Sequence, residues 1–404
     1  MYRIYLLLML GVLSGCVQPQ YVDKPYPRWG KEYPITGLSG TGNAVASDSL
    51  LLRVMAPSEG RPPVGCLLLV HGMNEYIGRY EDVAHFFSRQ YMVAGFDYFA
   101  HGLSNPVLQQ ADKRLADGAD KQDVSEAYLA QVALDDLEPL RRDLDRAIKK
   151  TVQICDAQDK SKKPVFIVAH SLGALVTVSY ALQRYGADEA ADRIAGVVLL
   201  GPGFAVSEVP GWRGWLANPL IKLSFHAETH FLHPHDEPLP VLLFNQLVSL
   251  LTVPILDGAF EVLSWPGIRR LATPAAPDWV VDYLTDSASE KARLRSDGWI
   301  IRRSLLRYVK GIENEIVQFR RHMDRFSLPY YLIFSVHDPI TPAWGSKDFI
   351  DATLHNHPDN AYQALQQWRY HQHLFLTEPL RSRLLHDIDQ WLARRIQALQ
   401  QEEE

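Results

Sequence analysis

Short apolar runs alternate with helical stretches along most of the chain. The runs are continuous, which is typical of parallel strands that are buried on both faces. They lie at 64–70, 92–97, 165–168, 196–200 and 330–335. Residues 137–154 instead have apolar positions at the spacing of an amphipathic helix. This alternation predicts an α/β fold, with a mostly parallel sheet flanked by helices.

The alternation stops between residues 204 and 325, where no clear strand is predicted. Five of the nine tryptophans lie there, together with apolar helical stretches such as 239–256. Structureless loops longer than about 15 residues are uncommon in compact domains, so we expect a large helical insertion. Its apolar side chains either line a tunnel or a membrane-facing lip, or form the insertion's own core, and the sequence favours neither. A polar stretch at about 107–130 predicts a smaller helical excursion.

The N-terminus has the pattern of a secretory signal. Arg3 precedes an apolar run at 4–12, which is too short to span a bilayer. The next residues are Leu13-Ser14-Gly15-Cys16, which resemble the lipobox of bacterial lipoproteins. That resemblance implies cleavage after residue 15 and a lipid on Cys16. Since residue 17 is Val rather than Asp, it also implies the outer membrane of a bacterial cell envelope. The alternative is an ordinary N-terminal helix with a chance cysteine.

The charge balance limits the partners. There are 41 Lys and Arg residues against 47 Asp and Glu residues, a formal net charge of −6. Loss of residues 1–15 removes one positive charge, Arg3, and leaves −7. Nucleic acids require a basic surface, so we expect no nucleic-acid partner. For the same reason, membrane attachment is expected through Cys16 rather than through surface charge.

Two other cysteines, Cys66 and Cys155, each lie close to an apolar strand run. The cell envelope tolerates disulfides, so a bridge between them is one interpretation. Two separate buried thiols is the interpretation that we favour.

Residues 165–168 lead into Ala169-His170-Ser171-Leu172-Gly173-Ala174. This is the nucleophile-elbow pattern of a strand that turns sharply into a helix, with Ala in place of the first Gly. Small residues on either side of the turn let strand and helix approach closely. Ser171 is therefore the candidate nucleophile. The N–H of Leu172, at the helix N-terminus, is a candidate oxyanion donor.

Two further segments carry a family resemblance. His71-Gly72-Met73-Asn74-Glu75 follows one predicted strand, with Arg79-Tyr80 soon after, and 96–104 follows the next. Together with the elbow, they resemble the monoacylglycerol lipase and lysophospholipase-like (serine aminopeptidase S33-like) branch of the α/β-hydrolase superfamily. The matched positions are His71, Gly72, Glu75, Arg79, Tyr80, Asp97, His101, Gly102, Ser104, His170, Ser171 and Gly173. The chain departs from the pattern at Tyr76, Ala100, Ala169 and Leu172. The resemblance covers roughly 50–203 and 325–395.

The resemblance implies the remaining site residues. The N–H of Met73 would be the second oxyanion donor, and His71, His101 and His170 would order their loops. The acid follows the strand at 330–335, where Asp338 matches and Asp348, inside a predicted helix, competes. The base is His373, because Glu378 follows at the family's spacing. His371 lacks that spacing and is interpreted as a rim residue.

The sequence also bears on metals and cofactors. His226, His230, His233 and His235 are close together, but Pro234 and Pro238 interrupt any helix that would align them, and no H-E-x-x-H pattern is present. We therefore expect no metal site. Hydrolysis by Ser171, His373 and Asp338 needs no cofactor.

The chain then divides as one split hydrolase domain. The signal is 1–15, the tether and lead-in are 16–45, and the core is 46–203 and 326–398. The helical cap is 204–325 and the tail is 399–404. The predicted function is a membrane-tethered serine hydrolase that cleaves carboxylic esters of lipid-like substrates, lysophospholipid or monoacylglycerol, through an acyl-enzyme. The alternatives are a peptidase or amide hydrolase of the same fold, and a non-catalytic binding lipoprotein.

Overall fold

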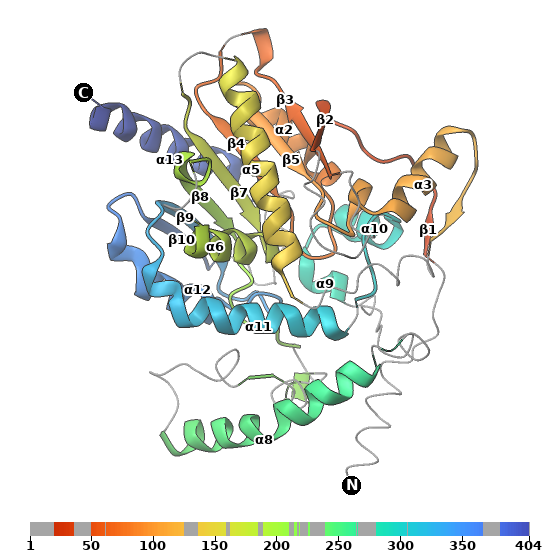
Figure 1. Ribbon diagram of the computed structural model, residues 1–404, viewed down its shortest axis with the longest axis vertical. Coiled ribbons are helices and arrows are strands. Elements are labelled where there is room, and N and C mark those ends of the chain that lie inside the picture. The colour runs from red at the N-terminus through yellow and green to blue at the C-terminus, as the bar shows by residue number, and fades with distance from the viewer. Residues whose placement is uncertain are drawn as a thin grey trace.

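A central sheet runs through the computed structural model (Figure 1). Within the described residues, it has eight strands in the order β10-β9-β8-β7-β4-β5-β3-β2. Their bounds are β2 Lys31–Ile35, β3 Leu50–Met55, β4 Cys66–Val70, β5 Met92–Phe96, β7 Val165–His170, β8 Ile194–Leu200, β9 Tyr330–Ser335 and β10 Ala361–Leu365. The six strands from β10 to β5 are parallel, and β3 and β2 add antiparallel pairs at one edge. The five predicted strands are confirmed as β4, β5, β7, β8 and β9.

The structure describes residues 20–35, 50–60, 62–124, 136–158, 162–184, 189–209, 214, 215, 218, 225, 226, 239–263, 265, 280–304, 306–366 and 380–403. The α-helices of the core are α2 Glu81–Phe87, α3 Pro106–Ala116, α5 Glu138–Gln158, α6 Leu172–Arg184, α11 Leu306–His322, α12 Ala343–Thr353 and α13 Leu380–Glu403. Those of the insertion before α11 are α8 Leu239–Leu263, α9 Val281–Leu284 and α10 Ala288–Ser296. A separate two-stranded sheet pairs β1 Tyr21–Val22 with β6 Gln122–Asp123.

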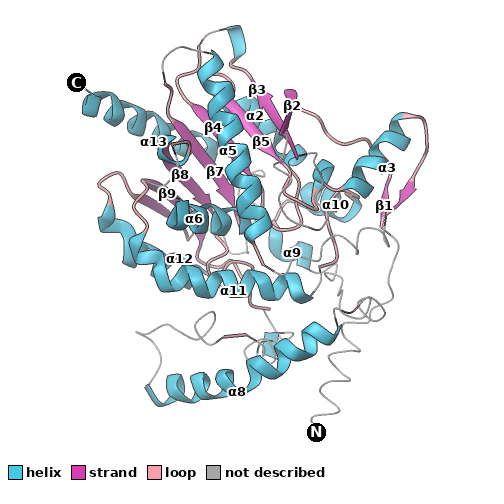
Figure 2. Cartoon of the chain, viewed as in Figure 1, coloured by secondary structure: helices cyan, strands magenta, loops and turns pink. Residues whose placement is uncertain are grey.

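Helices cover both faces of the sheet because successive strand residues point to opposite sides. In β4, Leu68 faces a core that also contains residues of α5, α6, α11 and α12. Leu67 and Leu69 face the opposite core, which contains residues of α2 and α13 (Figure 2). All five β4 residues are buried. The predicted α/β sandwich is therefore confirmed, and its double burial explains the continuous apolar runs.

Residues 20–35, which the sequence assigned to the tether and lead-in, are packed on the core. Tyr26 and Trp29 are buried, and the Trp29 Nε1–H donates to the Ile77 carbonyl at 3.0 Å. Gln20 Nε2 donates to the carbonyls of Gly298 and Ile300, both at 2.9 Å. Gln20, four residues after Cys16, therefore contacts the insertion.

Helices α11 and α8 differ in how they pack. Helix α11 lies against α6 and buries Phe319, whose ring stacks on Phe204 with a 4.4 Å centroid separation. Helix α8 lies apart from the sheet (Figure 1) and is held to α11 by an ion pair between Asp257 and Lys310 at 3.2 Å. Much of α8's apolar surface is exposed, as at Phe244, which is 64% exposed. The two helices thus belong to different layers of the molecule.

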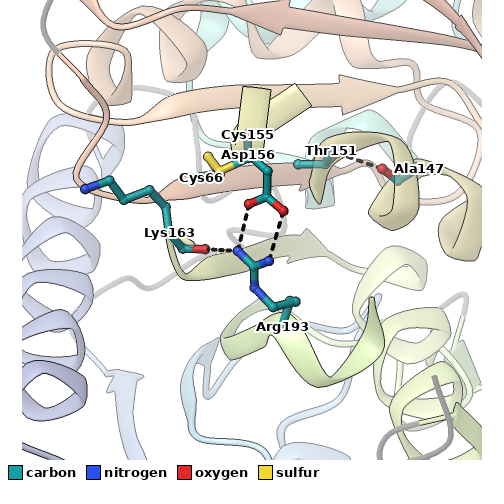
Figure 3. Close-up of a disulfide and its surroundings, with 7 residues drawn as sticks. All are labelled: Cys66, Ala147, Thr151, Cys155, Asp156, Lys163 and Arg193. Atoms are coloured by element: carbon teal, nitrogen blue, oxygen red, sulfur yellow. Dashed lines mark hydrogen bonds and ion pairs between the residues drawn. A yellow bond between two sulfur atoms is a disulfide. The ribbon is translucent and has the colours of Figure 1, made fainter. Parts of the chain in front are cut away.

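Cys66 and Cys155 form a disulfide, so the favoured interpretation of two separate thiols is wrong. Cys66 begins β4 and points to the face that α5 covers, where Cys155 lies near the end of that helix (Figure 3). The two Cα atoms are 6.3 Å apart, within the range that a disulfide bridges. Beside the bridge, Asp156 of α5 forms an ion pair with Arg193 at 3.0 Å. The bridge therefore links α5 to the centre of the sheet. No pattern in the sequence around the two cysteines predicts this pairing.

We expect the bridge to stabilise the fold without affecting catalysis. It closes a loop of 89 residues, and the chain-entropy model assigns such a loop about 4.6 kcal/mol. Urea unfolding of the wild type should shift to lower concentration when a reductant is added. The Cys66→Ala/Cys155→Ala variant should already unfold at the lower concentration and should not respond to the reductant. Equal unfolding midpoints for oxidised and reduced wild type would contradict the bridge.

Candidate active site

Ser171 lies at a sharp turn between β7 and α6. Its φ of 54° is in the left-handed region, which a residue other than Gly adopts only where the surroundings impose it. The Ser171 N–H donates to the Leu200 carbonyl at 2.9 Å, and its own carbonyl accepts from Gly203 N–H at 3.1 Å. These contacts hold the turn from the neighbouring strand. The predicted nucleophile elbow is therefore present at its predicted position.

Two glycines allow the loop after β4 to touch this turn. A Cβ on Gly72 would lie 3.0 Å from the Ser171 Cβ and 2.7 Å from Glu75 Oε1. A Cβ on Gly173 would lie 2.5 Å from the His71 carbonyl oxygen. Neither position has room for a side chain. This close approach brings the backbone around Met73 beside Ser171, as an oxyanion site next to that candidate nucleophile requires.

His71 braces the same loop. Its Nδ1 lies 2.8 Å from the Gly72 carbonyl, which only accepts, so Nδ1 carries the proton. Its Nε2 accepts from the Tyr98 N–H at 3.1 Å. Burial lowers the His71 pKa from 6.5 to about 4, so this ring is neutral at pH 7. Both nitrogens are engaged by backbone, which fits the loop-ordering role that we expected.

An apolar cavity of about 500 Å³ opens at the turn. Ser171 lines it together with both predicted oxyanion donors, Met73 and Leu172. Leu172 is the first residue of α6, where the backbone N–H has no partner within the helix. Much of the remaining lining is apolar and comes from the insertion and α11, for example Val281, Leu284, Leu294, Ile300, Ile301, Val309, Ile312 and Ile316. The structure thus brings the predicted nucleophile and both donors to one apolar site.

Asp338 follows β9 and is buried. Its Oδ1 accepts from the backbone N–H groups of Ile340 and Thr341, at 2.8 and 3.2 Å. Its Oδ2 accepts from the Thr341 hydroxyl at 2.8 Å. Ile340 and Thr341 both line the cavity, so the carboxylate is held at the edge of the site. The competing Asp348 lies on α12 and is paired with Arg320 at 2.6 Å.

The loop after β4 contributes two residues, Glu75 and Arg79, to a cluster of buried charges. Glu75 Oε1 is 2.8 Å from His170 Nδ1, and Glu75 Oε2 is 3.1 Å from Arg79. Burial alone would raise the Glu75 pKa, but His170 and Arg79 outweigh it and hold that pKa well below its usual value. Arg79 also reaches Glu290 of α10 at 2.7 Å. The sequence singled out Glu75 and Arg79 only as motif positions and gave no signal for Glu290, which lies 211 residues away.

Several predicted site residues lie outside the described residues. They include the base His373, its competitor His371, Glu378, the lipidation residue Cys16, and His230, His233 and His235. The fourth histidine of that group, His226, contacts Glu313 through Nδ1 at 2.6 Å. No group of three metal-ligating side chains is found among the residues that the structure describes.

The sequence matches the family described as "Serine aminopeptidase, S33" over residues 61–375. The chain belongs to this family. The match spans the elbow and the cavity, so the predicted S33-like relationship is confirmed. A search of curated proteins found no match to this sequence.

Solved structures of other enzymes share the fold. A monoglyceride lipase variant from Saccharomyces cerevisiae superposes with a TM-score of 0.59 at 16% identity, over 92% of this chain and 99% of that one. A Paleococcus ferrophilus monoacylglycerol lipase gives 0.54 at 17% identity, over 86% and 99%. A carboxyl esterase from Bacillus coagulans gives 0.50 at 15%, over 91% and 98%. At these identities, the likeness establishes the α/β-hydrolase fold of this S33 family member.

Proposed function

We propose that this S33 family member is a serine hydrolase that cleaves carboxylic esters of lipid-like substrates. The observation that carries the proposal is Ser171, held in a strained turn that lines an apolar cavity together with two candidate oxyanion donors. Strain at such a position persists only where the surrounding structure imposes it, and it is concentrated at functional sites.

The proposed reaction proceeds through an acyl-enzyme. His373 takes the Ser171 proton as the Oγ attacks the ester carbonyl, and the Met73 and Leu172 N–H groups bind the oxyanion. The tetrahedral intermediate collapses and expels the alcohol, which receives the proton from His373. Water then attacks the acyl-enzyme, with His373 again as base, and releases the acid and Ser171. Asp338 orients His373 and stabilises its imidazolium form.

The lining of the cavity supports a substrate with an acyl chain. Its volume lies in the range of small-molecule sites. Apolar side chains dominate the part of the lining contributed by the insertion and α11. A long acyl chain would bury its methylenes there, each worth about 0.8 kcal/mol. The lipase structures with the same fold were solved for proteins whose names specify monoacylglycerol and monoglyceride. We extend that class to this chain, with lysophospholipid as the second member.

We propose that the enzyme is tethered to the outer membrane through a lipid on Cys16. Only residues 17–19 separate Cys16 from Gln20, which is bonded to the insertion. A fully extended chain of that length reaches about 14 Å, so the insertion would lie close to the bilayer. Exposed apolar side chains on α8 are consistent with that location: Leu243, Phe244, Leu247, Leu250, Leu251 and Ile255. Within the described residues, no helix is long and apolar enough to cross a membrane.

Peptide or amide hydrolysis is the second candidate, because the matched family is named for a serine aminopeptidase. An aminopeptidase must recognise a free α-amino group. Two carboxylates, Glu75 and Glu313, line the cavity, but each is already paired with a cation, Arg79 and Lys310. That pairing favours the ester over the charged amine.

A substrate panel tests the proposal. Purified protein is given monoacylglycerols and lysophospholipids of several chain lengths, short p-nitrophenyl esters, and aminoacyl amides. We expect the highest kcat/KM on a long-chain monoacylglycerol or lysophospholipid, with lower values on short esters. Turnover of the aminoacyl amides alone would overturn the lipid ester assignment in favour of the second candidate.

A further inference from the structure

The loop that carries the proposed oxyanion donor Met73 is held from outside by the insertion. We call residues 72–80 the oxyanion loop and residues 290–304, which run from α10 to just before α11, the bracing segment. Four side-chain or backbone contacts join the two. They are Asn74–Ser304, Asn74–Ile301, Tyr76–Asp297 and Arg79–Glu290.

The first two contacts fix the residue that directly follows Met73. Asn74 has a φ of 61°, a left-handed conformation that Asn adopts more readily than most other residues with a Cβ. Its Nδ2 donates to Ser304 Oγ at 2.9 Å, and its carbonyl accepts from the Ile301 N–H at 3.0 Å. Both partners come from the bracing segment. The backbone orientation next to the oxyanion donor thus depends on residues more than 200 positions away.

The ion pair with Glu290 acts on the other half of the loop. The Arg79 side chain is only 5% exposed and contacts two carboxylates, Glu75 at 3.1 Å and Glu290 at 2.7 Å. Glu75 in turn contacts His170, the residue before Ser171. With Glu290 present, the positive charge of Arg79 is paired with two carboxylates, and Glu75 can also contact His170. Without Glu290, Glu75 would be the one carboxylate of these contacts that is left to pair with Arg79.

The bracing segment is itself fixed by the N-terminal residues. The Trp299 Nε1–H donates to the Lys24 carbonyl at 3.0 Å, and Gln20 binds the carbonyls of Gly298 and Ile300. Trp299 is buried, and its ring packs edge-on against Tyr26. The segment therefore has a rigid backing, as an element that positions a catalytic group requires.

From these contacts we infer that Glu290 and Ser304 are positioning residues for the oxyanion site. They hold the oxyanion loop so that the Met73 N–H points at the transition-state oxygen. The inference rests on the proposed serine-hydrolase function. It assigns to the insertion a part in the chemical step, in addition to any role in covering the cavity.

The test separates positioning from general stability. Glu290→Gln keeps the shape of the side chain and removes its charge, and Ser304→Ala removes the partner of Asn74 independently. Each variant is assayed for ester hydrolysis and for inhibition by a trifluoromethyl ketone, which adds to the serine and forms an oxyanion. Each is also assayed with an ether analogue of the same substrate, which binds without forming one. Glu189→Gln is the matched control, because it makes the same substitution in an exposed ion pair with Lys162, and neither residue belongs to the cavity lining or to the bracing segment.

We expect kcat/KM to fall about 10- to 100-fold in both variants, since small misplacements of an oxyanion donor are costly. The trifluoromethyl ketone should lose affinity by the same factor, because it reports on transition-state binding. Affinity for the ether and the activity of Glu189→Gln should stay within about twofold of the wild type.

Two results would overturn the inference. In an active wild type, unchanged ketone affinity in both variants would show that the bracing segment does not position the oxyanion site. Parallel loss of ketone and ether affinity would show a general loss of binding instead. A wild type that hydrolyses no ester and does not bind the ketone would instead refute the proposed function itself.

Discussion

Ester hydrolysis should fall about 10⁵- to 10⁶-fold in Ser171→Ala, the loss seen when the nucleophile of a serine triad is removed. What remains should be the modest acceleration that binding and the oxyanion site give to attack by water. The fold should survive the change. The contacts that hold the turn use the Ser171 backbone N–H and carbonyl, and an Ala is already present at a φ of 63°, at position 100.

A second serine controls for this experiment. Ser207 also lines the cavity, and its hydroxyl donates to the Ile340 carbonyl at 2.5 Å. Ser207→Ala removes a hydroxyl from the same cavity without removing the nucleophile. Its kcat should stay within about tenfold of the wild type, since a single neutral hydrogen bond is worth about 1 kcal/mol. Equal losses in the two variants would contradict the assignment of Ser171.

Asp338→Asn should lower kcat about 10⁴-fold, because an amide in place of the acid favours the wrong tautomer of the base. The structure predicts that this variant folds. Three hydrogen-bond donors from Ile340 and Thr341 hold the Asp338 side chain. The Asn oxygen can still accept from the two backbone N–H groups. KM should change far less than kcat, since the carboxylate acts on the base and not on the substrate.

Asp348→Asn is the matched control, because Asp348 was the other candidate for the acid. It is ten residues further along the chain, on α12, and its partner is Arg320. We expect some loss of thermal stability and a nearly unchanged kcat. A large loss of kcat in Asp348→Asn, with a normal Asp338→Asn, would reverse the assignment.

The sheet could be predicted because its chemistry is local. A parallel strand covered on both faces must be apolar throughout, so β4, β7 and β9 stand out in the sequence. The nucleophile elbow could also be predicted, because its steric demands fall on adjacent residues. The family resemblance identified Met73 and Asp338 as candidate site residues. The structure places Met73 at the cavity, and it places Ile340 and Thr341, which hold Asp338, there as well.

Contacts between distant segments could not be predicted in this way. The disulfide depends on where α5 ends above β4, and one turn of helix more or less would separate Cys155 from Cys66. Arg79 and Glu290 lie in distant parts of the chain, and no periodic pattern in the sequence predicts that they pair. The prolines in residues 20–35 are typical of a linker. The packing of this segment on the core could therefore not be predicted from its composition. In each case the information lies in the tertiary arrangement.

Labelling with a fluorophosphonate probe tests the central claim most directly, because the probe forms a stable adduct only with an activated serine. The wild type should gain one adduct, located by mass spectrometry on the peptide that contains Ser171, and a long-chain ester substrate should slow the labelling. Ser171→Ala should gain none, and Asp338→Asn should react much more slowly. An unlabelled wild type, or equal labelling of Ser171→Ala, would contradict the assignment of this chain as a serine hydrolase that acts through Ser171.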